Sequence, residues 1–260
     1  MPEVRNDGVR LAVEVAGEGE PVTVLGHGLT GSRRELQLFA PFLPGQTVLM
    51  DFRGHGESDS PEPGSYSFEH FAADLSTVAD VYGAKCAGGA SLGVAAILRL
   101  LTRQPDRFER LVFLFPARLD EEGAVKARLL RLAELLETKG PQEAAGIVIE
   151  EEAALGAFDD FPASRDYRRD AILNMNAKGV PNAIRETVEE EVLHDTSPLE
   201  AVSAPVLIIA QEGDPLHTSD VARDLADAFP SSQHIIYPTP GDLLRDIPAL
   251  VQRVVGFLAS

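Results

Sequence analysis

Short apolar runs rich in β-branched residues recur along the chain. Each run is bounded by glycine, proline or charged residues, which is typical of buried parallel strands. The runs predict strands at Val22–Leu25, Val48–Met50, Leu111–Phe115, Val206–Ile209 and His234–Tyr237. An alternating segment, Val9–Val15, predicts an antiparallel strand at the edge of the sheet.

Helical periodicity fills most of the intervals between these runs. The predicted helices are Ser32–Phe42, Ser67–Tyr82, Leu92–Arg103, Ser219–Phe229 and Leu243–Leu258. Alternation of strand and helix favours an α/β fold, with a mostly parallel sheet that helices cover on both faces.

One long interval has helical periodicity but no strand pattern. It runs over about residues 121–195 and carries acidic clusters at Glu150–Glu152 and Glu189–Glu191. Such charge runs are typical of solvent-exposed helix faces. We therefore expect a helical cap at 121–195, inserted into a core domain formed by residues 1–120 and 196–260.

Composition narrows the classes of partner. The 260 residues carry a formal net charge of −18, and no basic run offsets it locally. Nucleic acid and anionic membrane surfaces would repel such a chain, so neither is expected as a partner. The one cysteine, Cys86, cannot form an internal disulfide, and no apolar leader opens the chain, which favours a cytoplasmic location. No metal or cofactor is expected, because phosphate-binding loops, dinucleotide motifs and Cys/His ligand clusters are missing from the sequence.

The segment Gly89-Ala90-Ser91-Leu92-Gly93 is a G-x-S-x-G motif between a short strand-like run and an apolar helix. Glycines are needed there because a tight turn from strand to helix leaves no room for flanking side chains. Only the serine then projects. Its hydroxyl would lie at a helix N-terminus, where the Leu92 backbone N–H can donate to a developing oxyanion.

Three further loops make the sequence resemble the α/β-hydrolase fold superfamily. The first is LGHGLTGS at residues 25–32, the second DFRGHGESD at 51–59, and the third QEGDPLH at 211–217. The resemblance covers nearly the whole chain and implies a central sheet of about seven to eight strands with an inserted cap. It also implies that Leu29 provides a second oxyanion donor and Asp214 the acid of a Ser-acid-His triad, while His27 and His55 have structural roles.

The sequence departs from the family where the catalytic histidine is expected. In this family the histidine follows the last strand. An ungapped comparison places Asp242 at that position, and no histidine follows His234. A serine hydroxyl without a positioned base is a poor nucleophile at neutral pH.

Several residues are candidates for the general base or for the acid that pairs with it. His217 lies three residues after Asp214, and imidazole has a suitable pKa near 6.5. His194 is at the end of the predicted cap. Asp242 would need a raised proton affinity to act as a base, or it would cap the following helix. Asp120 is an alternative acid after the Leu111–Phe115 strand.

We therefore expect a serine hydrolase that acts on a small, neutral ester or lactone. Ser91 would be the nucleophile, Leu29 and Leu92 the oxyanion donors, Asp214 the acid and His217 the base. The rival hypothesis is a family member without hydrolytic activity that binds a small ligand or acts as a lyase, cyclase or isomerase, because one fold can carry many chemistries.

Overall fold

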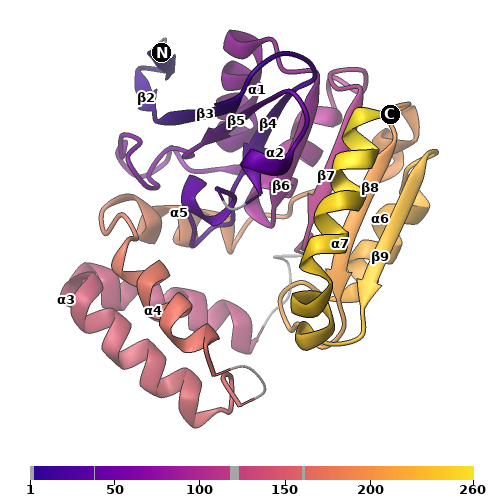
Figure 1. Cartoon of the computed structure of the whole chain (residues 1–260). Helices are drawn as coiled ribbons and strands as arrows, with labels where there is room; N and C mark the ends of the chain where they lie inside the picture. Colours follow the sequence, from indigo (N-terminus) through magenta and orange to yellow (C-terminus); the bar gives the residue numbers. More distant parts are fainter. Residues whose placement is uncertain (1–2, 38, 118–122, 160–161) are drawn as a thin grey trace.

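The computed structural model describes residues 3–37, 39–117, 123–159 and 162–260. A seven-stranded sheet with strand order β3-β5-β4-β6-β7-β8-β9 runs through the molecule (Figure 1). Strand β3 pairs antiparallel with β5, and all other neighbours in this sheet are parallel. The strands span Val13–Gly17 (β3), Val22–Gly26 (β4), Gln46–Met50 (β5), Cys86–Ala90 (β6), Arg110–Leu114 (β7), Val206–Gln211 (β8) and Ser232–Tyr237 (β9). The predicted α/β-hydrolase architecture is thereby confirmed.

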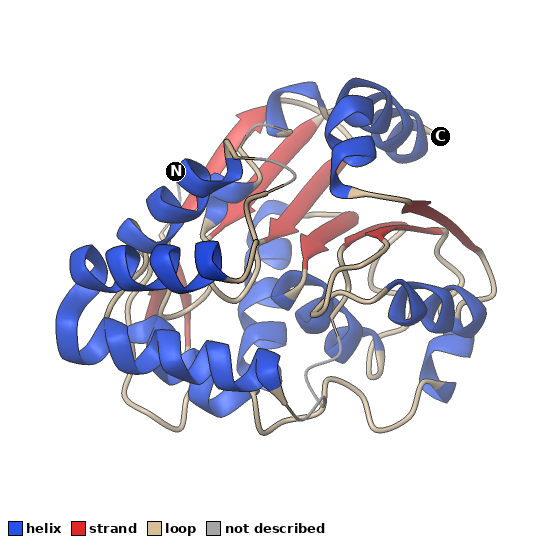
Figure 2. Cartoon of the chain, turned by 90° about the horizontal axis from the view of Figure 1, so that it is seen from below, coloured by secondary structure: helices blue, strands red, loops and turns tan. Residues whose placement is uncertain are grey.

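Helices lie on both sides of the strands (Figure 2). Helices α1 (Phe68–Tyr82), α2 (Leu92–Leu101) and α6 (Ser219–Ala228) share the largest apolar cluster with the sheet. Helix α7 (Pro240–Ala259) packs in a separate cluster on the other side. Strand β7 shows the division, because Leu111 and Phe113 belong to the first cluster and Val112 to the second, as alternation along a strand requires.

Between β7 and β8 the residues that the structure describes form three α-helices, which Figure 1 shows beyond one end of the strands. They are α3 (Ala124–Ala154), α4 (Ser164–Leu173) and α5 (Gly179–Thr187), and α3 contacts both others. Helix α3 is broken in its middle, where Gly140 has a φ of 75° and Pro141 follows. None of the helices in the described ranges combines the length and apolarity that a membrane crossing requires.

Two sequence predictions need correction. The expected helix at 32–42 is instead two short 3₁₀ turns, η1 (Arg33–Glu35) and η2 (Ala40–Phe42). Pro41 lies in the second turn, has no N–H to donate and disfavours helical geometry at the residue before it. The Val9–Val15 segment divides between β3 and a separate antiparallel pair, β1 (Val4–Asn6) with β2 (Val9–Leu11). A third short turn, η3 (Ser197–Ala201), precedes β8.

The strand order reverses its direction between β4 and β6. After β4 the chain continues to β5 on one side, and after β6 it continues to β7 on the other side. Ligands of open α/β sheets bind at such a reversal of strand order, outside the carboxyl ends of the strands. The loops that follow β4 and β6 contain Leu29 and Ser91.

Candidate active site

Ser91 stands at the turn between β6 and α2, and its backbone conformation is unusual. Its φ is 47° and its ψ is −101°, a combination that residues with a side chain rarely adopt. The turn is also tight. A Cβ on Gly89 would lie 2.6 Å from the carbonyl carbon of Gly93, and a Cβ on Gly93 would overlap the Gly26 carbonyl. Glycine at both positions therefore permits the bend, and the Ser91 side chain is left half-buried without a helix-capping hydrogen bond.

Two backbone amides lie beside this turn. Leu92 is the first residue of α2, where helical N–H groups have no acceptor within the helix. The peptide that carries the Leu29 N–H is fixed on its opposite edge, because the Gly28 carbonyl accepts hydrogen bonds from His27 Nδ1 at 2.7 Å and from the Gly31 N–H at 2.9 Å. Within the described ranges neither the Leu29 nor the Leu92 N–H has a protein acceptor. Both N–H groups are therefore candidate donors to a ligand.

Two buried histidines support the loop that contains Leu29. His27 Nε2 accepts the Phe52 N–H at 3.1 Å, so Nδ1 is the protonated nitrogen. His55 Nε2 lies 2.7 Å from the Leu29 carbonyl oxygen. Burial lowers the pKa of His55, and it lowers that of His27 well below the usual range. The His27 imidazole is therefore neutral at neutral pH, and both rings are structural groups that hold backbone carbonyls in place.

Asp214 and His217 form a pair in the loop after β8. His217 Nδ1 lies 3.1 Å from one carboxylate oxygen of Asp214, and the other oxygen accepts the backbone N–H groups of Leu216 and His217, each at 2.9 Å. Burial by itself would raise the pKa of Asp214. The ring hydrogen bond and charge of His217, together with the two backbone donors, outweigh burial and lower this pKa to about 2. Asp214 is therefore a carboxylate that fixes the orientation of the imidazole.

The second ring nitrogen of His217 is in a different situation. Nε2 is buried and has no hydrogen-bond partner among the described residues. The Phe115 ring packs edge-on against the imidazole, with the two ring centroids 6.1 Å apart. When Nδ1 donates to Asp214, Nε2 carries a free lone pair. A buried, unpaired nitrogen is costly unless a ligand or a reacting group uses it.

Comparison with protein families gives an independent assignment. A family model described as alpha/beta hydrolase fold matches residues 21–244. The chain belongs to the alpha/beta hydrolase fold family. No match was found among curated proteins.

Solved structures of other alpha/beta hydrolases cover almost all of the chain. An esterase from Thermogutta terrifontis is 22% identical, with a TM-score of 0.78, and the alignment covers 99% of this chain and 97% of the esterase. An enol-lactonase from Burkholderia xenovorans LB400 is 20% identical, with a TM-score of 0.80 and complete coverage of both chains. A bromoperoxidase from Bacillus anthracis is also 20% identical, with a TM-score of 0.76 and coverage of 97% and 96%. At these identities the likeness establishes the fold alone.

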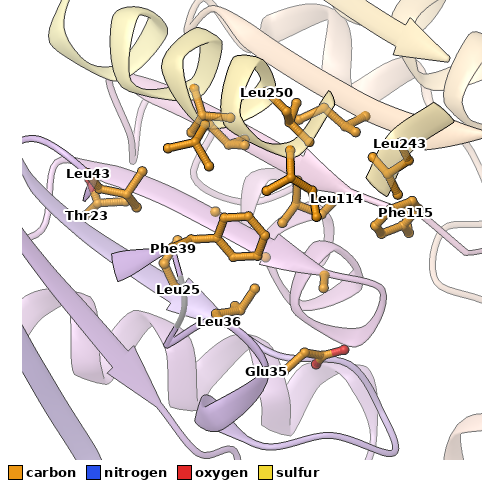
Figure 3. Close-up of a pocket in the computed structure, with 18 of the residues that line it drawn as sticks. Thr23, Leu25, Glu35, Leu36, Phe39, Leu43, Leu114, Phe115, Leu243 and Leu250 are labelled. Carbon is orange, nitrogen blue, oxygen red and sulfur yellow. The ribbon is translucent and has the colours of Figure 1, made fainter. Parts of the chain in front are cut away.

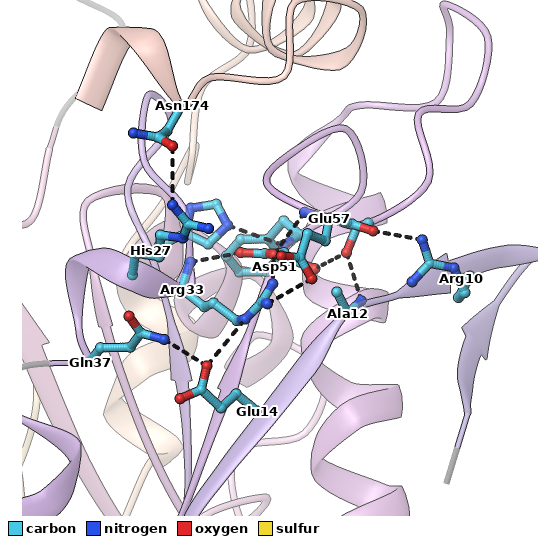
Figure 4. Close-up of polar contacts among 12 residues, drawn as sticks. Arg10, Ala12, Glu14, His27, Arg33, Gln37, Asp51, Glu57 and Asn174 are labelled. Carbon is cyan, nitrogen blue, oxygen red and sulfur yellow. Dashed lines mark hydrogen bonds and ion pairs between the residues drawn. The ribbon is translucent and has the colours of Figure 1, made fainter. Parts of the chain in front are cut away.

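Charged residues of the hydrolase loop after β5 are structural. Asp51 accepts the Arg33 N–H at 2.7 Å and the Glu57 N–H at 2.9 Å, and its carboxylate also forms an ion pair with the Arg33 guanidinium (Figure 4). Arg53 is buried and donates to both carboxylate oxygens of Asp74, at 2.8 and 2.7 Å. The Arg33–Asp51 contacts tie the segment after β4, which contains Leu29, to the segment after β5. The Arg53–Asp74 pair ties the segment after β5 to α1.

Glu35 is a residue of the site that sequence reasoning missed. Its carboxylate accepts the Gly28 N–H at 2.9 Å. A Cβ placed on Gly28 would be 3.4 Å from this carboxylate and 3.8 Å from the Ser91 Cβ, so Glu35 lies beside the Ser91 turn. Burial raises the pKa of Glu35, while the Gly28 hydrogen bond and the nearby charge of His217 lower it in part. No motif distinguishes this glutamate from the polar residues around it. The one sequence signal is its place nine residues after the end of β4, in the segment at the carboxyl end of that strand.

Asp242, which the ungapped comparison places at the usual histidine position, is in an environment that stabilises its ionised form. It lies in the first turn of α7, where its carboxylate accepts from Thr239 at 2.7 Å and from Arg245 at 2.5 Å. Hydrogen bonds from Thr239 and Arg245 lower its pKa, which is opposite to the raised proton affinity that a base would need. Helix α7 begins at Pro240 rather than Leu243, and Thr239 is its N-cap, so Asp242 does not cap it either.

The remaining candidates lie elsewhere. The His194 side chain is 78% exposed and pairs with Glu191. It borders a different cavity, together with Val221 and Leu225 of α6. Asp120 falls outside the described residues. Within the described ranges, no three His, Cys, Asp or Glu side chains are grouped so as to hold a metal ion.

Proposed function

We propose that this chain hydrolyses small, neutral carboxylic esters or lactones through a covalent intermediate on Ser91. The observation that carries the proposal is the state of His217, whose Nδ1 is held by Asp214 while its buried Nε2 has no partner. A general base needs one nitrogen held by an anion and the other free to take a proton, and His217 meets both conditions, although its Nε2 makes no hydrogen bond to Ser91 in this structure.

In the proposed reaction, the Ser91 hydroxyl attacks the substrate carbonyl carbon and its proton passes to His217 Nε2. The Leu29 and Leu92 N–H groups donate to the oxygen that becomes negative. The C–O bond to the leaving group then breaks, and the leaving alcohol takes the proton from His217. A water molecule, activated by the same nitrogen, hydrolyses the acyl-serine and restores the enzyme.

The proposed base lies in the loop after β8, not in the loop after the last strand. Asp214 and His217 are only three residues apart, so the acid and the base occupy one turn. The mechanism does not require a particular chain order, because acid, base and nucleophile recur in different orders on unrelated proteins. In this proposal, the chain differs from the usual family pattern in the loop that carries the catalytic imidazole, while the role of the imidazole as general base is the same.

Charge favours an uncharged substrate. The chain has a net charge of −18, and the Glu35 carboxyl lies beside the Ser91 turn. An anionic substrate would be repelled during its approach and again near the Glu35 carboxyl. Helices α3–α5 would act as the cap that covers the substrate, since Tyr167 of α4 borders the same cavity as Glu35.

Hydrolysis of short p-nitrophenyl esters and simple lactones tests the proposal directly. We expect Ser91→Ala and His217→Ala each to lower kcat/KM by about 10³-fold or more, because nucleophile and base act as one unit. His194→Ala is the matched control, since it removes an exposed histidine, and it should change kcat/KM by less than about twofold.

Two results would contradict either the hydrolytic activity or the assignment of His217 as the base. If the wild-type protein hydrolyses none of these compounds, the proposed function is wrong and the rival without hydrolytic activity is favoured. If Ser91 is essential but His217→Ala retains full activity, the protein is a hydrolase with a different base. Asp242→Asn would then identify or exclude the residue at the usual histidine position.

A further inference from the structure

The sheet face that α7 covers is not filled continuously. One apolar cluster there lies under α7, and a second, formed by Leu25, Leu36, Ala40 and Leu49, lies under the 33–43 segment. A cavity of about 310 Å³ is bordered by residues of both clusters (Figure 3). On the opposite face, by contrast, a single cluster joins the sheet to α1, α2 and α6.

The cavity wall is almost entirely apolar. Alternate residues of the strands face it, among them Leu25, Ala90 and Leu114, and α7 contributes Ile247 and Val251 one turn apart. Of the described residues that line it, the polar side chains are Thr23, Glu35 and Tyr167. Such a wall suits a hydrocarbon group and offers few hydrogen bonds to anything else.

Three of the lining residues also belong to the candidate active site. Ala90 immediately precedes Ser91, the Phe115 ring packs against His217, and Glu35 accepts the Gly28 N–H. In Figure 3, Glu35 lies at one edge of the cavity and Leu250 of α7 at the opposite edge. The cavity therefore extends from the candidate active site toward α7.

We propose that this cavity binds the uncharged alkyl group of an ester or lactone substrate, with the alkyl chain lying between the sheet and α7. The proposal rests on the proposed function, whose substrate class it narrows. An apolar cavity of about 150 Å³ is enough to bind benzene, so a cavity twice that volume would hold about eight to twelve carbon atoms. The carboxyl of Glu35 at the edge disfavours a ligand with its own negative charge there.

A chain-length series tests the proposal in the wild-type protein. Esters of p-nitrophenol with acyl chains of about two to twelve carbons are compared by kcat/KM. Each methylene that enters the cavity should raise kcat/KM by roughly two- to fourfold, until the cavity is full at about eight to twelve carbons. A flat series, or one that falls from the shortest ester onward, would overturn the proposal.

Variants of α7 test whether the alkyl chain of the substrate binds in this cavity. Val251→Phe fills the cavity from α7 and should abolish the gain in kcat/KM with acyl chain length. Val255→Phe is the matched control, because Val255 is a half-buried residue of the same helix that does not border the cavity. Ile247→Phe gives a second filling variant in case Val251→Phe does not fold, as judged by thermal unfolding.

Binding without hydrolysis separates this proposal from the proposed function. Octanamide, an uncharged compound that resists hydrolysis, is titrated calorimetrically into the wild type and Ser91→Ala, with acetamide for comparison. Octanamide should bind at least about tenfold more tightly than acetamide, and Val251→Phe but not Val255→Phe should remove this difference. If octanamide binds in this way and no ester is hydrolysed, the proposed function fails and the cavity stands as a ligand site. Octanamide binding that Val251→Phe leaves unchanged would overturn the cavity proposal.

Discussion

Asp214 and Glu35 are two carboxyl groups close to one imidazole, and their environments push their pKa values in opposite directions. Asp214 accepts three hydrogen bonds, and its pKa is about 2. Glu35 accepts one backbone hydrogen bond and is dominated by burial, so its pKa is raised. When the environments of two neighbouring carboxyl groups push their pKa values apart, the two groups can take different roles. Asp214 stays ionised and orients His217, whereas Glu35 takes up a proton more readily than an ordinary glutamate.

The raised pKa of Glu35 predicts how stability depends on pH. A glutamate in the unfolded chain has a pKa of about 4.3, and the folded value is higher. Between the two values the native state binds more protons than the unfolded state, so the free energy of unfolding falls as pH rises through this interval. Glu35→Gln keeps an acceptor for the Gly28 N–H but removes the charge. We expect it to gain stability relative to the wild type as pH rises from about 4 to about 7.

Thermal unfolding at several pH values checks this expectation. Glu150→Gln is the control, because it makes the same change on an exposed face of α3. The difference in Tm between Glu35→Gln and the wild type should grow with pH, while the difference for Glu150→Gln should stay constant. A Glu35→Gln variant that loses stability relative to the wild type as pH rises would show that burial of the charge does not dominate.

At the level of elements, the close approach of α2 to β4 positions the Ser91 turn. Gly93 in the first turn of α2 lies directly against the Gly26 carbonyl, and its own N–H donates to the His27 carbonyl at 3.0 Å. Gly93→Ala should therefore force the two elements apart and lower the free energy of unfolding by about 1 to 3 kcal/mol or more. Gly256 in α7 has open space around it, and Gly256→Ala should raise the free energy of unfolding by up to about 1 kcal/mol.

Chemical denaturation of both glycine variants measures the two effects. Because α2 carries Ser91 and the Leu92 amide, Gly93→Ala should also reduce hydrolytic activity, whereas Gly256→Ala should not. A Gly93→Ala protein as stable as the wild type would mean that β4 and α2 do not constrain each other.

Elements that local residue patterns determine could be predicted from the sequence. The β-branched runs located five of the six parallel strands, whereas β6 (Cys86–Ala90) has no β-branched residue and was indicated only by its place before the G-x-S-x-G motif. The glycines at 89 and 93 predicted the tight turn at Ser91. The helix expected at 32–42 was wrong, because its apolar periodicity was outweighed by Pro41 and by the contacts of Arg33 with Asp51 on another loop. Such contacts between distant segments leave no periodic signal.

The candidate site likewise contains residues that the sequence could predict and one that it could not. The spacing of three residues between Asp214 and His217 was sufficient to predict that they are neighbours, and the structure pairs them through Nδ1. Glu35 was missed because its neighbours Arg33 and Arg34 made it resemble one charge of an exposed helix. The burial of Glu35 depends on the direction in which the turn after Ser32 points its side chain. That direction is determined by contacts between segments that are distant in the sequence.

At the level of the whole molecule, the net charge of −18 should affect how substrates approach. Salt screens repulsion between separated charges, with a Debye length of about 10 Å at 0.1 M. For an anionic ester such as monomethyl succinate, kcat/KM should rise about two- to tenfold between about 10 mM and about 0.5 M NaCl. For a neutral ester of similar size it should change by less than twofold. An equal response of both esters would mean that the charge of the protein does not select substrates.

The proposed mechanism requires that the Ser91 hydroxyl is a nucleophile activated by His217. Its most direct test is the rate at which a fluorophosphonate modifies the protein, followed by intact mass and by peptide mapping. We expect one phosphonyl group per chain, on Ser91, and a rate at least about 10²-fold lower in His217→Ala than in the wild type. Modification at another residue, or an undiminished rate in His217→Ala, would contradict the claim.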